Sequence, residues 1–240
     1  MVAFGAAILL AGALPTLVQA STADRPLSVA EQSKWGAIGQ LTYGGKSEVG
    51  KVGVSEPGAA ICTGTLVAAD LVLTAGHCVA VNGVPMKAGD IQFAAGWRDG
   101  VSFAVRHGRG IVVAQPTAGQ PRQMSQDVAL LLLDAPIGPE IVRPLPLSRQ
   151  DLFAESYSFI GYRRDAPAFA QYSDICNLTG IEPGILRLSC PVVSGNSGAP
   201  VLKWRHGAWQ VAAVMVARGS DTLSYAVIPG DDLRAVIAGR

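Results

Sequence analysis

Charged residues are scarce in this chain. They make up 15% of its 240 residues and leave a formal net charge of only +1. A protein that binds nucleic acid usually carries a basic stripe, and no such stripe is present here, nor is an acidic tail. Aromatic residues account for 6% of the sequence, which is too few for the stacking platforms that hold single strands. The composition therefore argues against a nucleic-acid partner.

Long apolar runs are missing after the first segment. Beyond residue 20 no apolar run reaches the length of about 18 residues that a membrane-spanning helix needs, so we expect the mature protein to be soluble. Val2 to Ala13 is apolar but short, and Val18-Gln19-Ala20 places small residues where signal peptidase cuts. Residues 1–20 are therefore predicted to be a signal peptide, cleaved before Ser21, of a secreted or periplasmic protein. The usual basic residue at the start is missing, and a short membrane anchor is the alternative.

Glycine (28 residues) and proline (15 residues) are too frequent for a helical protein and favour short strands joined by turns. Strands are predicted at 35–41, 60–68, 71–74, 91–95, 101–106, 111–114 and 128–133, and then at 157–162, 172–178, 185–189, 199–204, 209–217 and 225–228. Two aspartates precede a short helix at 233–238. Prolines between 135 and 146 separate two halves, predicted as 35–140 and 141–240. Residues 21–34 are predicted to be an N-terminal arm or a short propeptide.

Cysteine is also rare, and its four residues are Cys62, Cys78, Cys176 and Cys190. An even number of cysteines in an exported protein indicates disulfide bonds. Four buried free thiols would suit an intracellular protein better. A zinc site does not fit the spacing, so no metal is expected.

Gly195-Asn196-Ser197-Gly198 has the composition of a turn that presents a reactive hydroxyl. Glycine permits the sharp backbone angles that such a turn needs. The backbone N–H groups of Gly195 and Ser197 are candidates for an oxyanion hole. Similar tetrapeptides also form ordinary loops, so the motif gains weight only from partners elsewhere. Ser194 lies outside the turn and is expected to line the cleft.

Two further segments supply those partners. His77 follows an apolar strand and precedes Cys78, whereas the other two histidines, His107 and His206, lie in polar turns. A serine hydroxyl needs a base such as histidine, and an aspartate on the far ring nitrogen fixes the tautomer. Asp127, directly before an apolar strand, is the candidate for that aspartate, and Asp134 in a turn is its nearest competitor. Alternatively, His77 is a core residue bonded to backbone and Asp127 an ordinary turn residue.

The three motifs, in the order His77, Asp127 and Ser197, resemble those of chymotrypsin-type serine peptidases, and in detail the bacterial, glutamyl-endopeptidase-like branch. The resemblance runs from Trp35 to the C-terminus and includes the segment 161–165. It implies an all-β fold of two packed antiparallel β-barrels with a short C-terminal helix. It also implies these three residues as a catalytic triad, an oxyanion hole at Gly195 and Ser197, and no cofactor.

The same resemblance implies the disulfide bonds Cys62–Cys78 and Cys176–Cys190. Each would close a loop of about 15 residues, worth roughly 3 kcal/mol in the chain-entropy model. The expected protein is a monomeric endopeptidase acting on protein or peptide substrates, and an inactive peptide-binding relative is the alternative. An esterase of the α/β-hydrolase type is disfavoured, because its Gly-x-Ser-x-Gly elbow is missing.

Two departures from the family pattern affect activation and specificity. Asn196 stands where animal relatives have an aspartate that pairs with a newly cut N-terminus, so the serine loop must be held by other bonds. Pro191 stands where trypsin-like relatives carry the carboxylate that binds a basic side chain. The substrate-binding residues implied by the resemblance are Pro191, Val192, Ser194, Val216, Arg218 and Tyr225. We expect small or medium uncharged residues before the cut, and an acidic preference set by Arg218 is the alternative.

Overall fold

The computed structural model describes residues 25–43, 60–82, 84–114, 123–149 and 157–240. The predicted signal peptide and residues 21–24 of the predicted arm lie outside these residues. The first part of the chain contains β1 (Arg25–Pro26), α1 (Val29–Lys34), β2 (Ile38–Tyr43), β3 (Ala60–Ala68), β4 (Leu71–Ala75), η1 (Gly76–Cys78), β5 (Ala80–Val81), β6 (Val84–Pro85), η2 (Ala88–Asp90), β7 (Ile91–Ala95), β8 (Ala104–Val113), η3 (Met124–Gln126) and β9 (Val128–Leu133). The second part contains β10 (Tyr157–Gly161), β11 (Gln171–Cys176), β12 (Leu178–Glu182), β13 (Ile185–Leu188), β14 (Pro200–Arg205), β15 (Ala208–Ser220), β16 (Leu223–Val227) and α2 (Asp231–Ala238).

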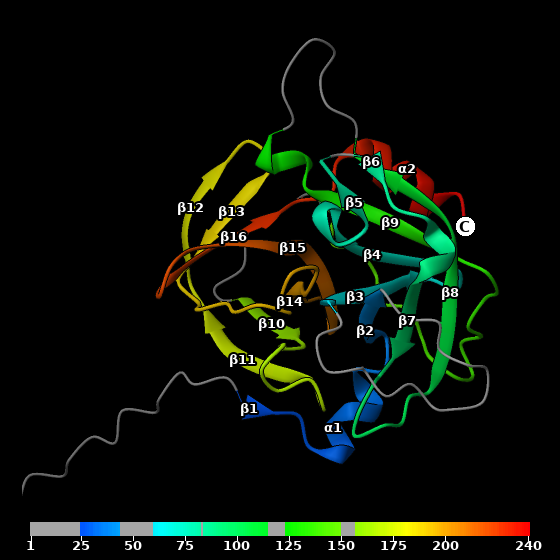
Figure 1. Cartoon of the computed structure of the whole chain (residues 1–240). Coiled ribbons are helices and arrows are strands. Elements are labelled where there is room, and N and C mark those ends of the chain that lie inside the picture. The colour runs from blue at the N-terminus through cyan, green and yellow to red at the C-terminus, as the bar shows by residue number, and fades with distance from the viewer. Residues whose placement is uncertain (1–24, 44–59, 83, 115–122, 150–156) are drawn as a thin grey trace, which may run out of the picture.

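These elements form two antiparallel β units that lie side by side (Figure 1). The first is a closed barrel with the strand order β2-β3-β4-β9-β8-β7. The second is an eight-stranded sheet with the order β1-β11-β10-β14-β15-β16-β13-β12. The predicted all-β class is therefore confirmed, and no helix among the described residues is long and apolar enough to span a membrane.

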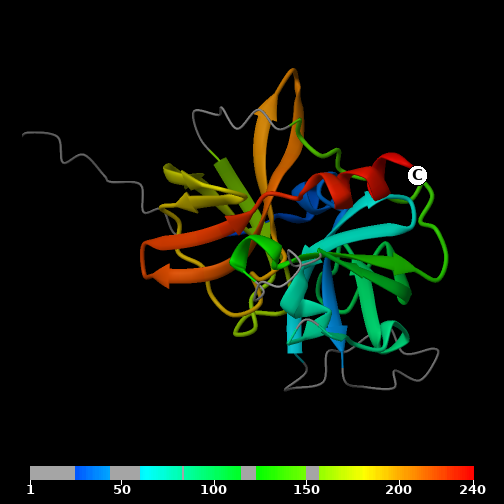
Figure 2. The ribbon, with the colours of Figure 1, turned by 90° about the horizontal axis from the view of Figure 1, so that it is seen from above.

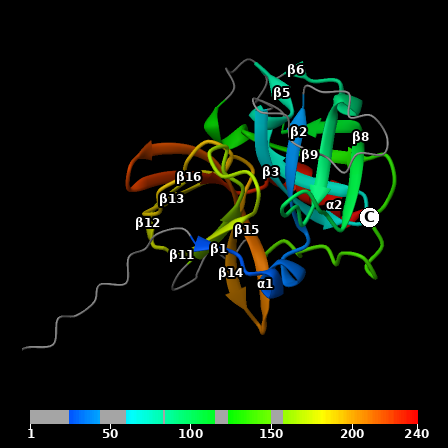
Figure 3. The same ribbon diagram turned by 60° about the horizontal axis from the view of Figure 1, so that its bottom comes forward.

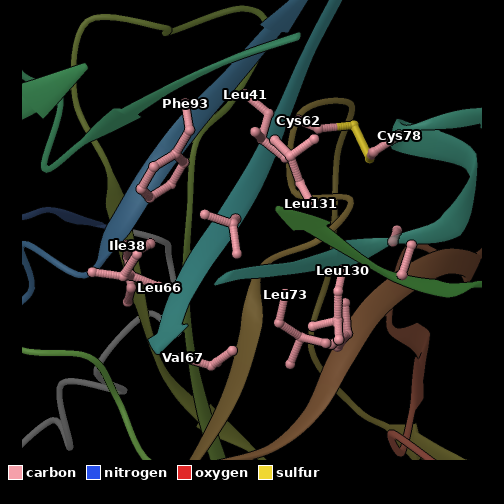
Figure 4. Packing of buried hydrophobic residues seen from close by; sticks show 14 of the residues in the cluster. Ile38, Leu41, Cys62, Leu66, Val67, Leu73, Cys78, Phe93, Leu130 and Leu131 are labelled. Atoms are coloured by element: carbon pink, nitrogen blue, oxygen red, sulfur yellow. A yellow bond between two sulfur atoms is a disulfide. The ribbon is translucent and has the colours of Figure 1, made fainter. Parts of the chain in front are cut away.

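The first barrel forms because its strands carry apolar side chains that meet inside it. Leu66, Leu73, Phe93 and Leu130 come from four different strands and are fully buried in one cluster (Figure 4). β4 and β9 pair antiparallel with Ala75 opposite Val128. The C-terminal end of β4 therefore lies beside the start of β9. This register brings together the two turns that carry the candidate histidine and aspartate.

Both ends of the described chain cross to the opposite unit. β1 pairs with β11 of the second unit, and the following Leu27 is 1% exposed. α2 carries the fully buried Leu233, which belongs to a core cluster made mostly of residues of the first barrel. Figure 2 shows α2 (red) beside the strands of that barrel, and Figure 3 shows β1 and α1 (blue) near β11 and β14. The residues 25–34 are thus packed as part of the folded domain.

The structure differs most from the predicted elements in three places. The strand predicted at 35–41 begins only at Ile38, because a helix precedes it that starts at a capping box of Ser28 and Glu31. The strands predicted at 101–106 and 111–114 are one strand, β8, with a register shift between Gly108 and Gly110. The strand predicted at 172–178 is two strands, which separate at residue 177.

Candidate active site

His77 and Asp127 meet at the register of β4 and β9. The imidazole Nδ1 lies 2.6 Å from Asp127 Oδ2, and the backbone N–H of His77 donates to Asp127 Oδ1 at 2.7 Å. The ionised carboxylate accepts hydrogen bonds only, so Nδ1 is the donor of this bond, and in the neutral tautomer Nε2 is then the acceptor. One carboxylate thus fixes both the ring and the turn that holds it.

A disulfide bond fixes the same turn from its other side. Cys78 follows His77 and is bonded to Cys62 of β3, as predicted, and the second predicted bond, Cys176–Cys190, is also present. A ring nitrogen of His77 lies within 4.8 Å of the two sulfurs of the first bond. Because these sulfurs are bonded to each other, this group of residues cannot hold a metal ion through thiolates.

The serine loop, residues 193–198, has a backbone that only glycine accepts at two points. Gly195 has a φ of +102° and Gly198 a φ of +85°. A Cβ at residue 195 would lie 2.8 Å from both the Arg164 nitrogen and the Tyr162 oxygen. A Cβ at residue 198 would overlap the carbonyl oxygen of Thr63. The two glycines therefore allow the loop to sit directly against neighbouring backbone.

Asn196 holds this loop from within. Its side chain is 1% exposed, donates from Nδ2 to the Tyr162 oxygen at 2.9 Å, and accepts from the Val193 N–H at 2.8 Å. The backbone N–H of Gly198 donates to the oxygen of Met215 on β15. Hydrogen bonds between uncharged groups thus hold the serine loop.

Thr63 joins the serine loop to the first barrel. Its buried hydroxyl donates to the Gly195 oxygen at 2.9 Å and accepts from the Tyr162 N–H at 2.9 Å. Its backbone N–H donates to the oxygen of Ser197 at 2.8 Å. Thr63 follows Cys62 directly, so the disulfide that fixes the His77 turn also leads to the residue that holds Ser197. This connection places the candidate base and nucleophile in one region.

Several polar groups around Ser197 keep a hydrogen-bonding position open. Within the described chain, the backbone N–H groups of Gly195 and Ser197 donate to no acceptor. The hydroxyl of Ser197 and the imidazole of His77 are also not hydrogen-bonded to each other among these residues. The first observation leaves two donors available for a ligand oxygen, and the second leaves the Nε2 of His77 and the Ser197 oxygen open.

A cleft of about 600 Å³ adjoins Ser197. Its lining residues are Arg164, Asp165, Val192, Val193, Ser194, Asn196, Ser197, Met215, Val216, Ala217 and Arg218. A second cleft, of about 280 Å³, adjoins His77 and is lined also by Gly76, Ala80, Asn82, Gln123, Met124 and Asp127. The two candidate catalytic side chains therefore open toward concave surface on both sides.

The predicted substrate-binding residues divide into two groups. Val192, Ser194, Val216 and Arg218 line the larger cleft, whereas Pro191 and Tyr225 do not. Pro191 is exposed where the chain leaves the Cys176–Cys190 bond. Tyr225 lies on β16 opposite Ala217, with its ring against Gly219. The floor of the cleft is thus shaped by β15 rather than by β16.

A family profile for the trypsin-like peptidase domain matches residues 62–213. The chain belongs to the trypsin-like peptidases. No curated protein sequence matches it.

Solved structures resemble this trypsin-like peptidase over most of its length. A Glu endopeptidase in complex with MPD aligns with a TM-score of 0.68 and 19% identity, over 90% of this chain and 95% of that chain. Protease Anisep from Arthrobacter nicotinovorans aligns with a TM-score of 0.66 and 17% identity, over 85% and 96%. The thermostable serine protease AL20 from an extremophilic microorganism aligns with a TM-score of 0.64 and 16% identity, over 85% and 95%. The structural similarity establishes a shared fold, and at these low identities it does not establish the substrate.

Sequence reasoning did not identify two residues that matter in this trypsin-like peptidase. Thr63 carries no motif, since one threonine in a β-branched strand is unremarkable before its partners across the fold are known. Arg164 lay inside a segment that supported the family resemblance, but nothing in that segment indicated that it lines the cleft. Thr63 meets the serine loop across a separation of 132 residues, and the position of Arg164 depends on an irregular turn that packs against Ser194.

Proposed function

We propose that this trypsin-like peptidase is an exported serine endopeptidase with the catalytic triad His77, Asp127 and Ser197. The observation that carries the proposal is the two-point bond between Asp127 and His77, which orients the imidazole and leaves its Nε2 for the nucleophile. The unpartnered N–H groups of Gly195 and Ser197 support it, because an acyl-transfer site needs both a base and an oxyanion hole.

In the acylation step, Ser197 Oγ attacks the carbonyl carbon of the substrate and its proton passes to Nε2 of His77. The imidazolium that forms is stabilised by the carboxylate of Asp127. The carbonyl oxygen becomes an oxyanion and accepts hydrogen bonds from the N–H groups of Gly195 and Ser197. When the tetrahedral intermediate collapses, the C–N bond breaks and His77 gives its proton to the departing amine.

In the deacylation step, a water molecule takes the place of the amine. His77 removes a proton from the water as its oxygen attacks the acyl carbon of the ester on Ser197. The second tetrahedral intermediate is held by the same two N–H groups. The ester C–O bond then breaks, His77 returns the proton to Ser197 Oγ, and the carboxylic acid product leaves.

The substrate chain before the cut has a place to bind on β15. β14 pairs with β15 only as far as Pro200 opposite Val214, whereas β16 continues to pair with it as far as Ser220. Among the described strands, residues 216–220 therefore keep one edge unpaired next to the larger cleft. An extended peptide can add to such an edge through backbone hydrogen bonds.

The lining of the cleft favours a small or medium uncharged side chain before the cut. Val192, Met215 and Val216 are buried apolar residues of the lining, and an unpaired charge among them would cost several kcal/mol. Arg218 at the same cleft supports the acidic alternative, as does the likeness to a Glu endopeptidase. The ratio of kcat/KM for peptides that differ only at this residue separates the two. Lysine or arginine as the best residue would contradict both, and glutamate as the best, with its advantage lost in Arg218→Ala, would favour the alternative.

The triad is tested by labelling with a fluorophosphonate, which reacts with an activated serine. We expect labelling of the wild-type protein at Ser197, no labelling and no turnover in Ser197→Ala, and a loss of several powers of ten in His77→Ala. Ser194→Ala is the matched control and should still be labelled. Folded wild-type protein that resists the label would instead favour an inactive peptide-binding relative. N-terminal sequencing of protein from the export compartment tests cleavage before Ser21.

A further inference from the structure

The larger cleft contains three ionisable side chains, and two of them have an oppositely charged partner among the described residues. Both carboxylate oxygens of Asp165 are engaged by Arg163, at 2.9 and 2.7 Å. Arg218 lies 3.5 Å from Asp221, which is almost fully exposed. The guanidinium of Arg164 has no partner among the described residues. The cleft therefore has a surplus of positive charge, and Arg164 carries the part of it that is not compensated.

The backbone of Arg164 is fixed against the oxyanion hole. Its N–H donates to the oxygen of Ser194 at 2.8 Å, and its nitrogen would lie 2.8 Å from a Cβ at residue 195. Two residues earlier, the oxygen of Tyr162 accepts the hydrogen bond from Asn196. The backbone at Arg164 is therefore held by hydrogen bonds to the serine loop, although the residue is exposed.

Arg164 and Arg218 line the same cleft but belong to segments that hold different parts of the serine loop. The segment 162–164 holds the loop at Ser194 and Asn196, whereas β15 holds it at Gly198 through Met215. The free edge of β15, which leads to Arg218, is the side that receives the part of the substrate before the cut. The chain after the cut must leave away from that edge, and we place it along the segment 162–164, whose Arg164 N–H is bonded to Ser194.

We propose that Arg164 recognises a carboxylate on the leaving-group side, so that the enzyme prefers aspartate or glutamate as the first residue after the cut. This inference rests on the proposed function. A guanidinium presents a fork of donors that matches a carboxylate in two-point geometry. Because the side chain is exposed, the preference for Glu over an isosteric Gln should be about 5-fold, and it should fall as salt screens the pair.

Acyl transfer tests this side of the cleft alone. The enzyme is acylated with an ester substrate that has an uncharged residue before the bond, and glutamic acid amide or glutamine amide is added to compete with water. The two amines differ only in charge, and the acyl group and its binding to β15 are the same in both reactions. We expect the glutamic acid amide to be the better acceptor, by about 5-fold.

Variants assign the preference to one arginine. Arg164→Gln should reduce the ratio between the two amines to about one, and Arg164→Lys should keep part of it because the charge remains. Arg218→Gln is the matched control: it removes the same charge from the other wall and should leave the ratio unchanged. A wild-type ratio near one, a ratio that survives in Arg164→Gln, or one that is lost in Arg218→Gln would overturn the proposal. If no acyl-enzyme forms on Ser197, it is the proposed function that fails.

Discussion

The hydroxyl of Thr63 is expected to contribute strongly to both the stability and the activity of this protein. Thr63→Val replaces the hydroxyl with a methyl group of similar volume. The Gly195 oxygen then loses its donor and the Tyr162 N–H loses its acceptor, in a place that excludes water. Each buried group left without a partner costs about 1–3 kcal/mol, so the free energy of unfolding should fall by about 2–6 kcal/mol. That is a large fraction of the stability of an ordinary domain, about 5–15 kcal/mol.

The same substitution should slow the reaction. If the loop relaxes to find new partners, the N–H of Gly195 moves with it, and removal of one donor from an oxyanion hole costs about 100-fold to 1,000-fold in kcat. Partial movement should give a smaller loss, of about 10-fold or more. KM should change little, because the binding edge of β15 is not touched. Denaturant unfolding and steady-state kinetics measure the two effects separately.

Thr65→Val provides the matched control on the same strand. Thr65 is also buried, two residues further along β3, but its hydroxyl has no hydrogen-bond partner among the described residues. The same chemical change should there be neutral or slightly stabilising, since it removes an unsatisfied polar atom. If Thr63→Val unfolds within about 0.5 kcal/mol of wild type, a typical effect of an uninvolved position, and retains full kcat, the bridging role of Thr63 is wrong.

Two further predictions concern the serine loop and the N-terminal arm. Gly198→Ala should lower the free energy of unfolding by about 2–5 kcal/mol and remove most of the activity, because the new Cβ would meet the Thr63 backbone at a positive φ. Gly207 also has a positive φ, +77°, but open space around it, so Gly207→Ala should cost only about 1 kcal/mol. Equal losses in the two variants would refute the clash. Hydrogen bonds from Arg25 and Ser28 lower the pKa of Glu31 from 4.5 to about 2, so the stability that it gives the arm is present above pH 4.5 and is lost as the pH falls toward 2. Glu31→Gln should remove this pH dependence, which the NMR signal of the Trp35 indole, packed against Trp209, reports; an unchanged titration of that signal in the variant would contradict it.

The parts predicted well from sequence are those that local chemistry determines. The His77 and Ser197 turns can be recognised from their glycine and cysteine residues and from the apolar strands beside them. The register of β4 with β9 then brings Asp127 to His77. The sequence analysis predicts an arm in place of α1, because the segment is polar, although Ser28 and Glu31 have the spacing of a capping box. The positions of Thr63 and Arg164 depend on which loops pack against the serine loop, and no local pattern encodes that.

The crossing of the chain ends bears on when the protein becomes active during its synthesis. Leu233 is buried in the core cluster made mostly of residues of the first barrel, yet it follows all sixteen described strands. Until α2 has been made, the apolar surface that Leu233 covers stays exposed. The serine loop needs Thr63 from this barrel and Met215 from the second sheet, so it takes its final shape only after both units have docked. We therefore expect proteolytic competence to be among the last properties that a newly made chain acquires.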